Sequence, residues 1–453
     1  MKKQLFGTDG IRGVAGEYPL DPRTVYAAGM ALARLVKNAA GSRPSDHQSE
    51  VLIGMDTRES SEPIARQLAA GLAAGGAKPC CAGVITTAGV AHLTARDFAM
   101  GVMISASHNS FEDNGIKVFS PSGFKLPDEQ EAIVEQTIFE LLRQTMEPAE
   151  LDLPVDPEPL KEYLAYLLAA DGGVEGLRPM KLIVDCANGA ASTLAPQLFA
   201  ELGMDADVIH CRPDGRNINK DCGSMHLAAL GAKVPAAGAQ LGVAFDGDAD
   251  RALFVAEDGS IVDGDAILLM AAEYLAAHNR LTNNLVVTTV MANMGLEKAL
   301  QERRLCMVRT PVGDKYVLEE MVRRGAALGG EQSGHIIFRE YATTGDGLLT
   351  ARMILRVLSE TKKSLSALKN GLAVFPQRLE NIRIKHKIPF EQVPALRDAV
   401  AQSEQELIGR GRVVVRYSGT EPLVRIMVEA EDMPLVNEHV SRLAGLFQAQ
   451  LGA

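Results

Sequence analysis

Short runs of β-branched and other apolar residues alternate with alanine- and leucine-rich stretches through the first three quarters of the chain. We expect the short runs to form buried strands and the longer stretches to form helices, which is the pattern of layered α/β domains. The predicted strands are Val51–Met55, Val102–Ile104, Leu182–Asp185, Leu241–Phe245 and Leu285–Val290. The predicted helices include Thr24–Asn38, Ile64–Ala74, Leu160–Ala170 and Ala266–Ala277.

The pattern changes in the last eighty or so residues. Ile382 and Ile384 alternate with polar positions, a helical stretch fits residues 394–407, and two apolar runs at Val413–Tyr417 and Leu423–Val428 flank a turn. This order, β-α-β-β-α, predicts a small α+β unit that follows the α/β part of the chain.

Three breaks in composition divide the 453 residues, which are too many for one ordinary core. The stretch "TMEPAELDLPVDPEPLKEY" is rich in proline and acid and reads as a linker, and weaker breaks occur at "AEDGSIVDGD" and near "KNGLAVFPQR". We therefore expect domains at residues 1–150, 151–255, 256–372 and 373–453.

The net charge, the length of the apolar runs and the spacing of the cysteines argue against several classes of function. The formal net charge of -11 argues against nucleic-acid binding, although arginines and lysines that converge locally can still bind an anionic substrate. No apolar run could span a membrane, and no apolar core follows the two N-terminal lysines, so we expect neither a membrane protein nor a signal peptide. The six cysteines form no CxxC motif, which indicates reduced thiols in a cytoplasmic protein rather than a zinc or redox motif.

Four loops carry the candidate chemistry, and the first follows the apolar run Val102–Ile104. It contains Ser105, Ser107, His108 and Asn109, and the chain then turns through residues 112–115. These residues could simply form a turn and cap the next segment. No GxSxG motif surrounds either serine, so an esterase nucleophile is not indicated, whereas Ser107 could carry a phosphoryl group.

The second loop, "FDGDADRALF", places Asp246, Asp248 and Asp250 at alternate positions. Carboxylates this close repel one another unless a cation lies between them, and hard oxygen ligands suit Mg²⁺ or Ca²⁺. The spacing is also similar to an EF-hand loop, but Arg251 occupies the position where that loop needs glycine, and the flanks look like strands rather than helices. We therefore favour a Mg²⁺ loop in which Arg251 contacts a phosphate.

The third loop, "GGEQSGHIIF", lets the backbone approach a ligand closely through its glycines. Glu331 and Ser333 can hydrogen-bond polar groups of a substrate, and His335 could transfer protons near neutral pH. The competing interpretation is a glycine-rich turn in which the histidine only forms structural hydrogen bonds and has no role in catalysis.

The fourth loop, "VRYSGTEPLVRIMV", lies between the last two predicted strands. Backbone amides, hydroxyls and two guanidinium groups here make a good phosphate site, although an ordinary hairpin with solvated arginines would look the same. The candidate phosphate ligands are Arg416, Ser418, Gly419, Thr420 and Arg425. No GxxxxGK[ST] motif marks a P-loop nucleotide enzyme.

Taken together and in order, these motifs resemble the α-D-phosphohexomutase superfamily over the whole chain. "FGTDGIRG" at residues 6–13 is similar to the N-terminal signature, "SASHN" to the phosphoserine loop, "DGDADR" to the metal loop, "GEQSGH" to the sugar-specificity loop and "RYSGTEP" to the phosphate-binding loop. "DGRNINKDCGS" at residues 214–224 resembles a stretch typical of the glucosamine branch.

The resemblance implies four domains around a central cleft. Three are similar α/β domains with mixed sheets, and the fourth is an α+β domain of the TATA-binding-protein-like kind. It also implies an isomerase that interconverts the 6-phosphate and the 1-phosphate of glucosamine, a precursor step toward UDP-N-acetylglucosamine. The reaction would pass through a phosphoserine enzyme and a 1,6-bisphosphate intermediate.

Roles for individual residues follow from the same resemblance. Ser107 matches the phosphorylated serine and Ser105 its unphosphorylated neighbour, while one Mg²⁺ per subunit would be held by Asp246, Asp248, Asp250 and a Ser107 phosphate oxygen. Arg12, Lys117 and Arg251 would support the transferring group, and Lys117, His108 and His335 are the candidates for proton transfer. Glu331 and Ser333 would hydrogen-bond the sugar hydroxyls, and the fourth loop would bind the phosphate that is not being transferred.

Some features depart from the pattern or leave alternatives open. Ser110 stands where the family usually has proline, and Met225 and His226 follow "CGS" where smaller residues are common. A phosphomannomutase or phosphoglucomutase with the same mechanism is the nearest alternative, followed by a Mg²⁺-dependent phosphatase and a Ca²⁺-binding sugar-phosphate sensor. The expected partner is a hexosamine phosphate, with a hexose 1,6-bisphosphate as activator, and the assembly could be a homodimer.

Overall fold

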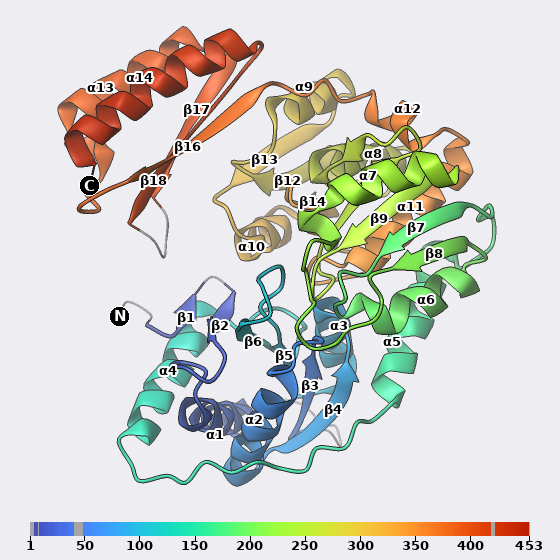
Figure 1. Ribbon diagram of the computed structural model, residues 1–453, viewed down its shortest axis with the longest axis vertical. Coiled ribbons are helices and arrows are strands. Elements are labelled where there is room, and N and C mark those ends of the chain that lie inside the picture. Colours follow the sequence, from blue (N-terminus) through green and yellow to red (C-terminus); the bar gives the residue numbers. More distant parts are fainter. Residues whose placement is uncertain (1–3, 8, 40–48, 418–421, 453) are drawn as a thin grey trace. The chain divides into compact units, whose positions relative to one another are not determined.

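The computed structural model describes residues 4–7, 9–39, 49–417 and 422–452. The chain divides into two compact units, one comprising residues 1–289 and 308–370 and the other residues 290–307 and 371–453. Figure 1 shows the elements in sequence colours, and each unit is described by itself below. No helix of the described residues is long and apolar enough to cross a membrane.

The first unit begins with a six-stranded mixed sheet in the order β1-β2-β6-β5-β3-β4. β3 runs parallel to β4 and β5, whereas the β1, β2, β6 side of the sheet is antiparallel. The strands are β1 (Phe6–Gly7), β2 (Gly10–Val14), β3 (Glu50–Met55), β4 (Lys78–Val84), β5 (Met100–Ile104) and β6 (Asp113–Phe119). The helices are α1 (Pro22–Ala39), α2 (Ser61–Gly75), α3 (Thr87–Asp97) and α4 (Asp128–Leu142).

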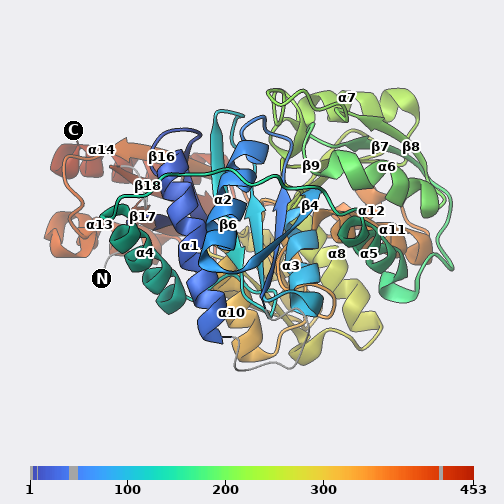
Figure 2. The same ribbon diagram turned by 90° about the horizontal axis from the view of Figure 1, so that it is seen from below.

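Helices cover both faces of this sheet because β5 and residues 51–55 of β3 are apolar and buried at every position. Val51 and Ile53 of β3 belong to one core with α1, α2 and α4, while the Gly54 position faces Val90 of α3. Alternate side chains of a strand point to opposite faces, so a continuous apolar run needs a helical layer on each side. In Figure 2, α1 and α2 lie side by side next to this sheet.

The second sheet has the order β11-β10-β9-β7-β8 and repeats the same plan. β7 is parallel to β8 and β9, and β9, β10 and β11 form an antiparallel meander. The elements are α5 (Glu158–Ala169), β7 (Lys181–Asp185), α6 (Ala191–Glu201), β8 (Asp205–Ile209), α7 (Leu227–Ala237), β9 (Leu241–Phe245), β10 (Ala252–Ala256) and β11 (Ile261–Val262). The sheet thus continues to Val262, seven residues past the domain boundary that we predicted at residue 255. The position of that boundary stays a prediction.

The third sheet has the order β13-β12-β14-β15, with β12 parallel to β14 and β15 antiparallel to it. Asp263 and Asp346 cap α8 and α11 by accepting backbone N–H bonds from Ala266 and Leu349. The elements are α8 (Gly264–Ala277), β12 (Leu285–Thr289), β13 (Cys306–Thr310), α10 (Asp314–Arg324), β14 (Leu328–Gly330), β15 (Ile336–Phe338), α11 (Gly347–Thr361) and α12 (Leu365–Lys369).

The second unit contains an antiparallel sheet in the order β16-β18-β17, with two helices packed on one apolar core. Its C-terminal part runs β-α-β-β-α, which confirms the predicted α+β unit. The elements are α9 (Met294–Glu302), β16 (Gln377–Arg383), α13 (Pro394–Glu406), β17 (Gly411–Tyr417), β18 (Leu423–Ala430) and α14 (Met433–Leu451).

The predicted strands and helices all occur, with ends that differ by a few residues. One local prediction is wrong: residues 113–115 do not continue a turn but begin β6, where Asp113, Asn114 and Gly115 pair with β2. Polar side chains hid this strand, because Asn114 is buried and hydrogen-bonds two serines of the α2 N-terminus instead of facing water. The end of the predicted linker is also helical, since α5 begins at Glu158.

Candidate active site

The serine loop follows β5 at its carboxyl end. Ser107 has a left-handed backbone (φ 56°), and its side chain is buried. Its backbone N–H donates a 2.9 Å hydrogen bond to Oγ of Ser105, which holds the turn. A left-handed conformation is uncommon for serine, so the surrounding structure imposes it at the residue predicted to carry the phosphoryl group.

Two side chains from other segments donate hydrogen bonds to backbone carbonyl groups of this loop. Nη2 of Arg58 donates to the carbonyl oxygens of Ser107 (3.2 Å) and Asn109 (2.7 Å), and Nδ2 of Asn219 donates to the same two oxygens at 2.9 Å each. Arg58 is itself held by an ion pair with buried Asp56. Four hydrogen bonds to backbone oxygens therefore fix where the Ser107 side chain points.

The acidic loop is the turn between β9 and β10, which confirms the strand flanks expected for a metal loop rather than an EF-hand. Asp246, Asp248 and Asp250 are all buried, and one carboxylate oxygen from each lies within 4.8 Å of the others. Oγ of Ser107 donates a 2.6 Å hydrogen bond to Oδ2 of Asp246. A side chain at Gly247 would begin 2.4 Å from the Ser107 carbonyl oxygen, so only glycine lets the two loops approach this closely.

The donor set fits a hard divalent cation. Within the described residues, the buried Oδ1 atoms of Asp248 and Asp250 have no hydrogen-bond partner. Burial, together with the charges of Asp250 and Asp248, raises the pKa of Asp246 to about 8. Buried carboxylate oxygens that face one another without donors are the arrangement that Mg²⁺ or Ca²⁺ stabilises.

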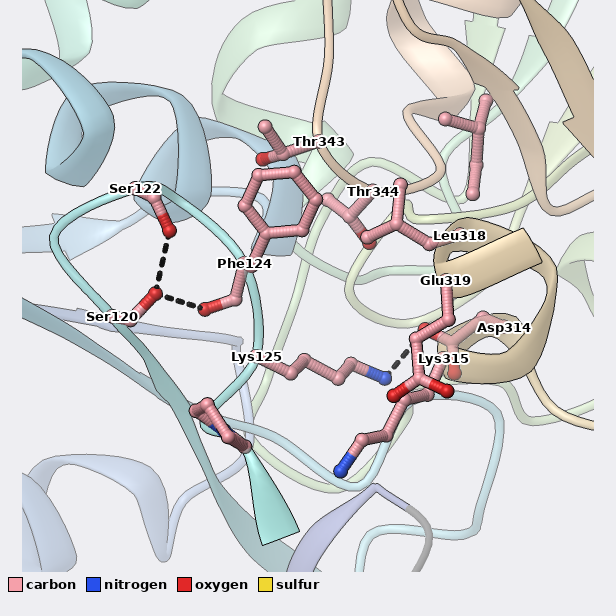
Figure 3. Close-up of a pocket in the computed structure, with 12 residues that line it drawn as sticks. Ser120, Ser122, Phe124, Lys125, Asp314, Lys315, Leu318, Glu319, Thr343 and Thr344 are labelled. Carbon is pink, nitrogen blue, oxygen red and sulfur yellow. Dashed lines mark hydrogen bonds and ion pairs between the residues drawn. The ribbon is translucent and has the colours of Figure 1, made fainter. Parts of the chain in front are cut away.

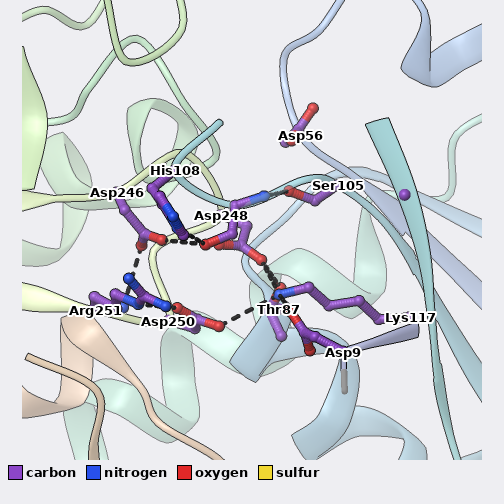
Figure 4. Close-up of polar contacts among 12 residues, drawn as sticks. Asp9, Asp56, Thr87, Ser105, His108, Lys117, Asp246, Asp248, Asp250 and Arg251 are labelled. Atoms are coloured by element: carbon purple, nitrogen blue, oxygen red, sulfur yellow. Dashed lines mark hydrogen bonds and ion pairs between the residues drawn. The ribbon is translucent and has the colours of Figure 1, made fainter. Parts of the chain in front are cut away.

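Lys117 reaches the acidic loop from β6 (Figure 4). Its Nζ lies 2.7 Å from Asp248, 3.2 Å from Asp9 and 3.4 Å from Asp250. Burial alone would lower the pKa of Lys117, but the three carboxylates outweigh it and hold that pKa well above its usual value. A lysine that stays charged can neutralise a phosphoryl group but cannot accept a proton from a sugar hydroxyl.

Arg12 and a second lysine extend this charge network through Asp9. Arg12 on β2 and Lys125 both form ion pairs with Asp9, and Lys125 also pairs with Asp314 at the start of α10. Lys125 and Asp314 border a cavity of about 300 Å³ (Figure 3). The cavity is lined by Ser120, Ser122, Phe124, Lys125, Pro127, Asp314, Lys315, Leu318, Glu319, Ile337, Thr343 and Thr344.

His108 and Arg251 flank Ser107 and the acidic loop. Nδ1 of His108 lies 3.3 Å from Oγ of Ser107, and burial, followed by the charges of Arg251 and Arg12, lowers the His108 pKa to about 4. The backbone N–H of Arg251 donates to Asp246, and its guanidinium lies 3.7 Å from Asp250. The imidazole is thus neutral near pH 7, whereas the guanidinium is charged.

His335 belongs to the glycine-rich third loop and faces the acidic loop. Its Nε2 accepts a 2.8 Å hydrogen bond from the backbone N–H of Gly345, and its Nδ1 faces Asp250 at 3.7 Å. Burial would lower its pKa, but Asp250 and Asp314 outweigh that effect and raise it. Because Nε2 is already an acceptor within the protein, the geometry favours a positioning role, and proton transfer by His335 stays a prediction.

Glu331 and Ser333 lie in the same loop and remain partly exposed. Oε1 of Glu331 accepts a 3.2 Å hydrogen bond from the backbone N–H of Gly313, and its Oε2 lies 3.5 Å from Oγ of Ser333. The structure therefore brings these two side chains together with polar atoms at the surface of the loop.

Arg416 and Arg425 lie directly opposite each other on the antiparallel strands β17 and β18. Burial, together with the charge of Arg425, lowers the pKa of Arg416. Like charges directly opposite in a sheet are destabilising, and a bound anion would relieve the repulsion. Ser418, Gly419 and Thr420, which we predicted to complete this site, lie outside the described residues.

Several residues of this site were not predicted from the sequence: Asp9, Asp56, Arg58, Thr87, Lys125, Asn219 and Asp314. Asp56 and Arg58 directly follow β3, and the carboxyl ends of parallel strands are where α/β sheets collect functional side chains. Their position just after a predicted strand could therefore have marked Asp56 and Arg58 as candidate site residues. Thr87, which donates to Asp248 from the first turn of α3, offered no such signal.

Comparison with known proteins places this geometry in a family. The chain matches all four phosphoglucomutase/phosphomannomutase domain models: alpha/beta/alpha domain I at residues 3–144, domain II at 154–259, domain III at 263–374 and the C-terminal domain at 379–446. It is 51% identical over 457 residues to a curated phosphoglucosamine mutase of Solibacter usitatus, covering 100% of both chains. A second curated phosphoglucosamine mutase, from Koribacter versatilis, is 49% identical, covering 99% of this chain and 98% of that one.

A solved structure agrees with these matches. The phosphoglucomutase/phosphomannomutase family protein of Burkholderia thailandensis superposes with a TM-score of 0.80 at 25% identity, covering 99% of each chain. The chain therefore belongs to the phosphoglucomutase/phosphomannomutase family of α-D-phosphohexomutases.

Proposed function

We propose that this chain is a phosphoglucosamine mutase, which interconverts glucosamine 6-phosphate and glucosamine 1-phosphate. The observation that carries the proposal is the Ser107 hydroxyl, which is held in a strained loop and lies 2.6 Å from Oδ2 of Asp246, one of three buried carboxylates that face one another. A phosphatase or a sensor does not need a serine placed in this way. The names of the curated relatives favour glucosamine over mannose or glucose as the sugar.

The reaction begins with a phosphoryl group on Ser107. O1 of glucosamine 6-phosphate gives its proton to a basic group of the site and attacks the phosphorus. The bond from phosphorus to Oγ of Ser107 breaks, Oγ takes a proton, and glucosamine 1,6-bisphosphate forms. After the intermediate has reoriented, Oγ of Ser107 loses its proton and attacks the 6-phosphoryl group, the bond from phosphorus to O6 breaks, O6 takes a proton, and glucosamine 1-phosphate leaves. A trace of hexose 1,6-bisphosphate can phosphorylate Ser107 by the same step and so start the cycle.

Asp246, Asp248 and Asp250 are the residues that would hold Mg²⁺, together with a phosphate oxygen on Ser107. When bound, the cation withdraws charge from the phosphoryl oxygens, which is worth several kcal/mol of barrier in metal-assisted phosphoryl transfer. The Lys117, Arg12 and Arg251 side chains add fixed positive charge around the same group. Arg58 and Asn219 position the loop, and thereby orient Oγ for an in-line displacement.

Of the three candidates for proton transfer, His108 is best placed. Its Nδ1 is within 3.3 Å of Oγ of Ser107, whereas Lys117 is held charged by three carboxylates and Nε2 of His335 is occupied. A phosphoryl group on Ser107 would raise the low pKa of His108 because it brings negative charge close to the ring. His108 would then be able to return a proton to Oγ as the phosphoryl group leaves.

Substrate recognition is assigned to two further sets of residues. Glu331 and Ser333 would hydrogen-bond the O3 and O4 hydroxyls of the sugar. Arg416 and Arg425, together with Ser418, Gly419 and Thr420, would bind the phosphate that is not being transferred. The same clamp would serve both half-reactions because the two phosphates of the intermediate exchange roles.

The test is to follow glucosamine 6-phosphate, mannose 6-phosphate and glucose 6-phosphate separately by ³¹P NMR, with purified enzyme, Mg²⁺ and a trace of glucose 1,6-bisphosphate. We expect a 1-phosphate signal to appear fastest from the glucosamine ester. A clear preference for mannose or glucose would retain the mechanism and replace the sugar. Release of inorganic phosphate without any 1-phosphate would overturn the mutase assignment in favour of a phosphatase.

A further inference from the structure

Three side chains with metal-binding atoms converge in the second sheet, outside the acidic loop. Asp185 ends β7, His210 directly follows β8, and Cys222 lies in the segment that leads to α7. A carboxylate oxygen, an imidazole nitrogen and a thiol sulfur from these residues all lie within 4.8 Å of one another. The phosphoryl-transfer mechanism above uses none of the three.

The surrounding backbone holds this cluster in place. Oδ1 and Oδ2 of Asp185 accept hydrogen bonds from the backbone N–H groups of Ala187 (2.9 Å) and Gly223 (3.0 Å). His210 has a left-handed backbone (φ 45°), a conformation that costs energy in a residue with a side chain. Cys222 is 1% exposed. The positions of these side chains are therefore fixed by the fold rather than by their mutual attraction.

The nitrogen of His210 is the feature that points to a cation. Nδ1 lies 3.0 Å from Oδ2 of Asp185, and it is buried, yet among the described residues it has no partner with hydrogen-bond geometry. The sulfur of Cys222 has only a weak contact, 3.9 Å from Nδ2 of Asn188. An imidazole nitrogen, a carboxylate oxygen and a thiol that face one another in this way present three electron-pair donors to one point.

Ligand chemistry selects the ion. Thiolate and imidazole are the ligands that Zn²⁺ and other late divalent transition metals prefer, whereas Mg²⁺ takes oxygen ligands. The side chain of His210 is 37% exposed, which leaves room for water or an external ligand to complete four-fold coordination. We propose that Asp185, His210 and Cys222 form a second metal site, selective for Zn²⁺-like ions over Mg²⁺.

This site lies next to a segment that the serine loop depends on. The backbone N–H of Asn219 donates to the Ala187 carbonyl (2.9 Å), and the side chain of the same residue grips the Ser107 and Asn109 carbonyls. A metal bound to Asp185 and Cys222 would join β7 to the segment that carries Asn219. It would therefore stabilise the support of the serine loop without entering the acidic loop, and this inference does not depend on which sugar the enzyme uses.

Cobalt spectroscopy on the intact, reduced chain tests the proposal. Excess Mg²⁺ is added first to occupy the acidic loop, and Co²⁺ is then titrated in. A cobalt–thiolate bond gives an intense near-ultraviolet charge-transfer band that an all-oxygen site cannot produce. We expect the band to saturate at one Co²⁺ per chain and to disappear when Zn²⁺ is added in competition.

Variants decide which residues bind. Cys222→Ser should abolish the band, and His210→Gln, a change of a partly exposed side chain, should weaken Co²⁺ binding at least tenfold. Cys80→Ser, which removes a partly exposed thiol in another sheet, is the matched control and should leave the band unchanged. Far-UV circular dichroism and thermal unfolding confirm that each variant is folded. Absence of the band in the wild type, an undiminished band in folded Cys222→Ser, or an unchanged Co²⁺ affinity in folded His210→Gln would overturn the site.

Discussion

The hydroxyl of Ser107 donates a 2.6 Å hydrogen bond to Oδ2 of Asp246, a residue 139 positions further along the chain. This bond joins the loop after β5 to the loop after β9, and Gly247 permits the contact because any side chain there would meet the Ser107 carbonyl. The serine proposed to carry the phosphoryl group and the carboxylates proposed to bind the cation are thus in direct contact, so a change in one loop should alter the other.

Replacing Ser107 with alanine removes the proposed phosphoryl acceptor. We expect Ser107→Ala to lower kcat by at least about 10³-fold, because the transfer then has no covalent carrier. The fold should persist, since the backbone groups gripped by Arg58 and Asn219 remain. The measurement is turnover of glucosamine 6-phosphate, combined with mass spectrometry for loss of the phosphorylated form.

Ser105→Ala is the matched control for this experiment. Oγ of Ser105 accepts the Ser107 N–H bond, so its loss should loosen the turn and reduce activity by a far smaller factor. If Ser107→Ala kept near-normal turnover while Ser105→Ala lost it, the carrier role would move to Ser105.

Asn219→Ala tests a positioning residue. Its amide supports two carbonyl oxygens of the serine loop and touches no reacting atom, so the variant should lower kcat by roughly 10- to 100-fold through misplacement of Oγ. KM and the Mg²⁺ requirement should change little. A proportionate rise in KM with unchanged kcat would instead assign Asn219 to substrate binding.

Asp248→Asn tests the cation site. The carboxylate has one buried oxygen without a hydrogen-bond partner in the described chain, and its other oxygen holds Lys117 and Thr87. Losing its charge should raise the Mg²⁺ concentration needed for half-maximal activity at least about tenfold. Calorimetric titration of Mg²⁺ checks binding directly, and an unaltered Mg²⁺ affinity would mean that the ion binds elsewhere.

The sequence predicted Ser107 and the three aspartates more readily than the residues that support them. These four residues stand in short motifs whose composition suggested chemistry, and their loops follow apolar runs that were predicted to be strands. The supports act through tertiary contacts between segments far apart in sequence. Arg58 reads as a surface residue in "DTRESS", yet it is buried beside Asp56 with its guanidinium on two carbonyl oxygens.

β6 illustrates the same limit in secondary structure. Residues 113–115 have turn-like composition, and only their pairing with β2 and the serines that receive the Asn114 amide make a strand favourable there. Cys222 is a second case. The spacing of cysteines in the sequence gives no sign of Asp185, His210 and Cys222 as a group, because they come from β7, the end of β8 and a later loop. Spacing in sequence reveals sites made by one segment and conceals sites made by several.

Arg416→Ala tests the proposed phosphate clamp. Removing one of two arginines directly opposite each other should raise KM for glucosamine 6-phosphate at least tenfold, because a charge-assisted bond to phosphate is lost, while kcat changes less. Arg383→Ala, exposed on β16 at the other edge of the sheet, is the matched control and should keep normal kinetics. An unchanged KM in Arg416→Ala would remove this residue from the clamp.

A pH-dependent stability effect should arise from His92 on α3, away from the reacting groups. Its ring stacks on Tyr166 of α5 with the centroids 3.7 Å apart, and burial, followed by the charge of Arg96, lowers its pKa to about 4. In the unfolded chain the pKa is about 6.5. The unfolded state therefore binds more protons between these values, and stability present above pH 6.5 is lost as the pH falls toward 4.

His92→Phe keeps an aromatic ring against Tyr166 but cannot be protonated. The carboxylates titrate in the wild type and in the variant alike, so the difference between the two proteins reports the contribution of His92. At pH 5 the wild type should have lost about 2 kcal/mol from this histidine, relative to pH 7.5, and the variant should have lost none of it. The wild-type Tm should then fall roughly 2 °C more than the variant Tm over this interval. Thermal unfolding at the two pH values measures the difference, and parallel decreases in both proteins would show that His92 is protonated as easily in the folded chain as in the unfolded one.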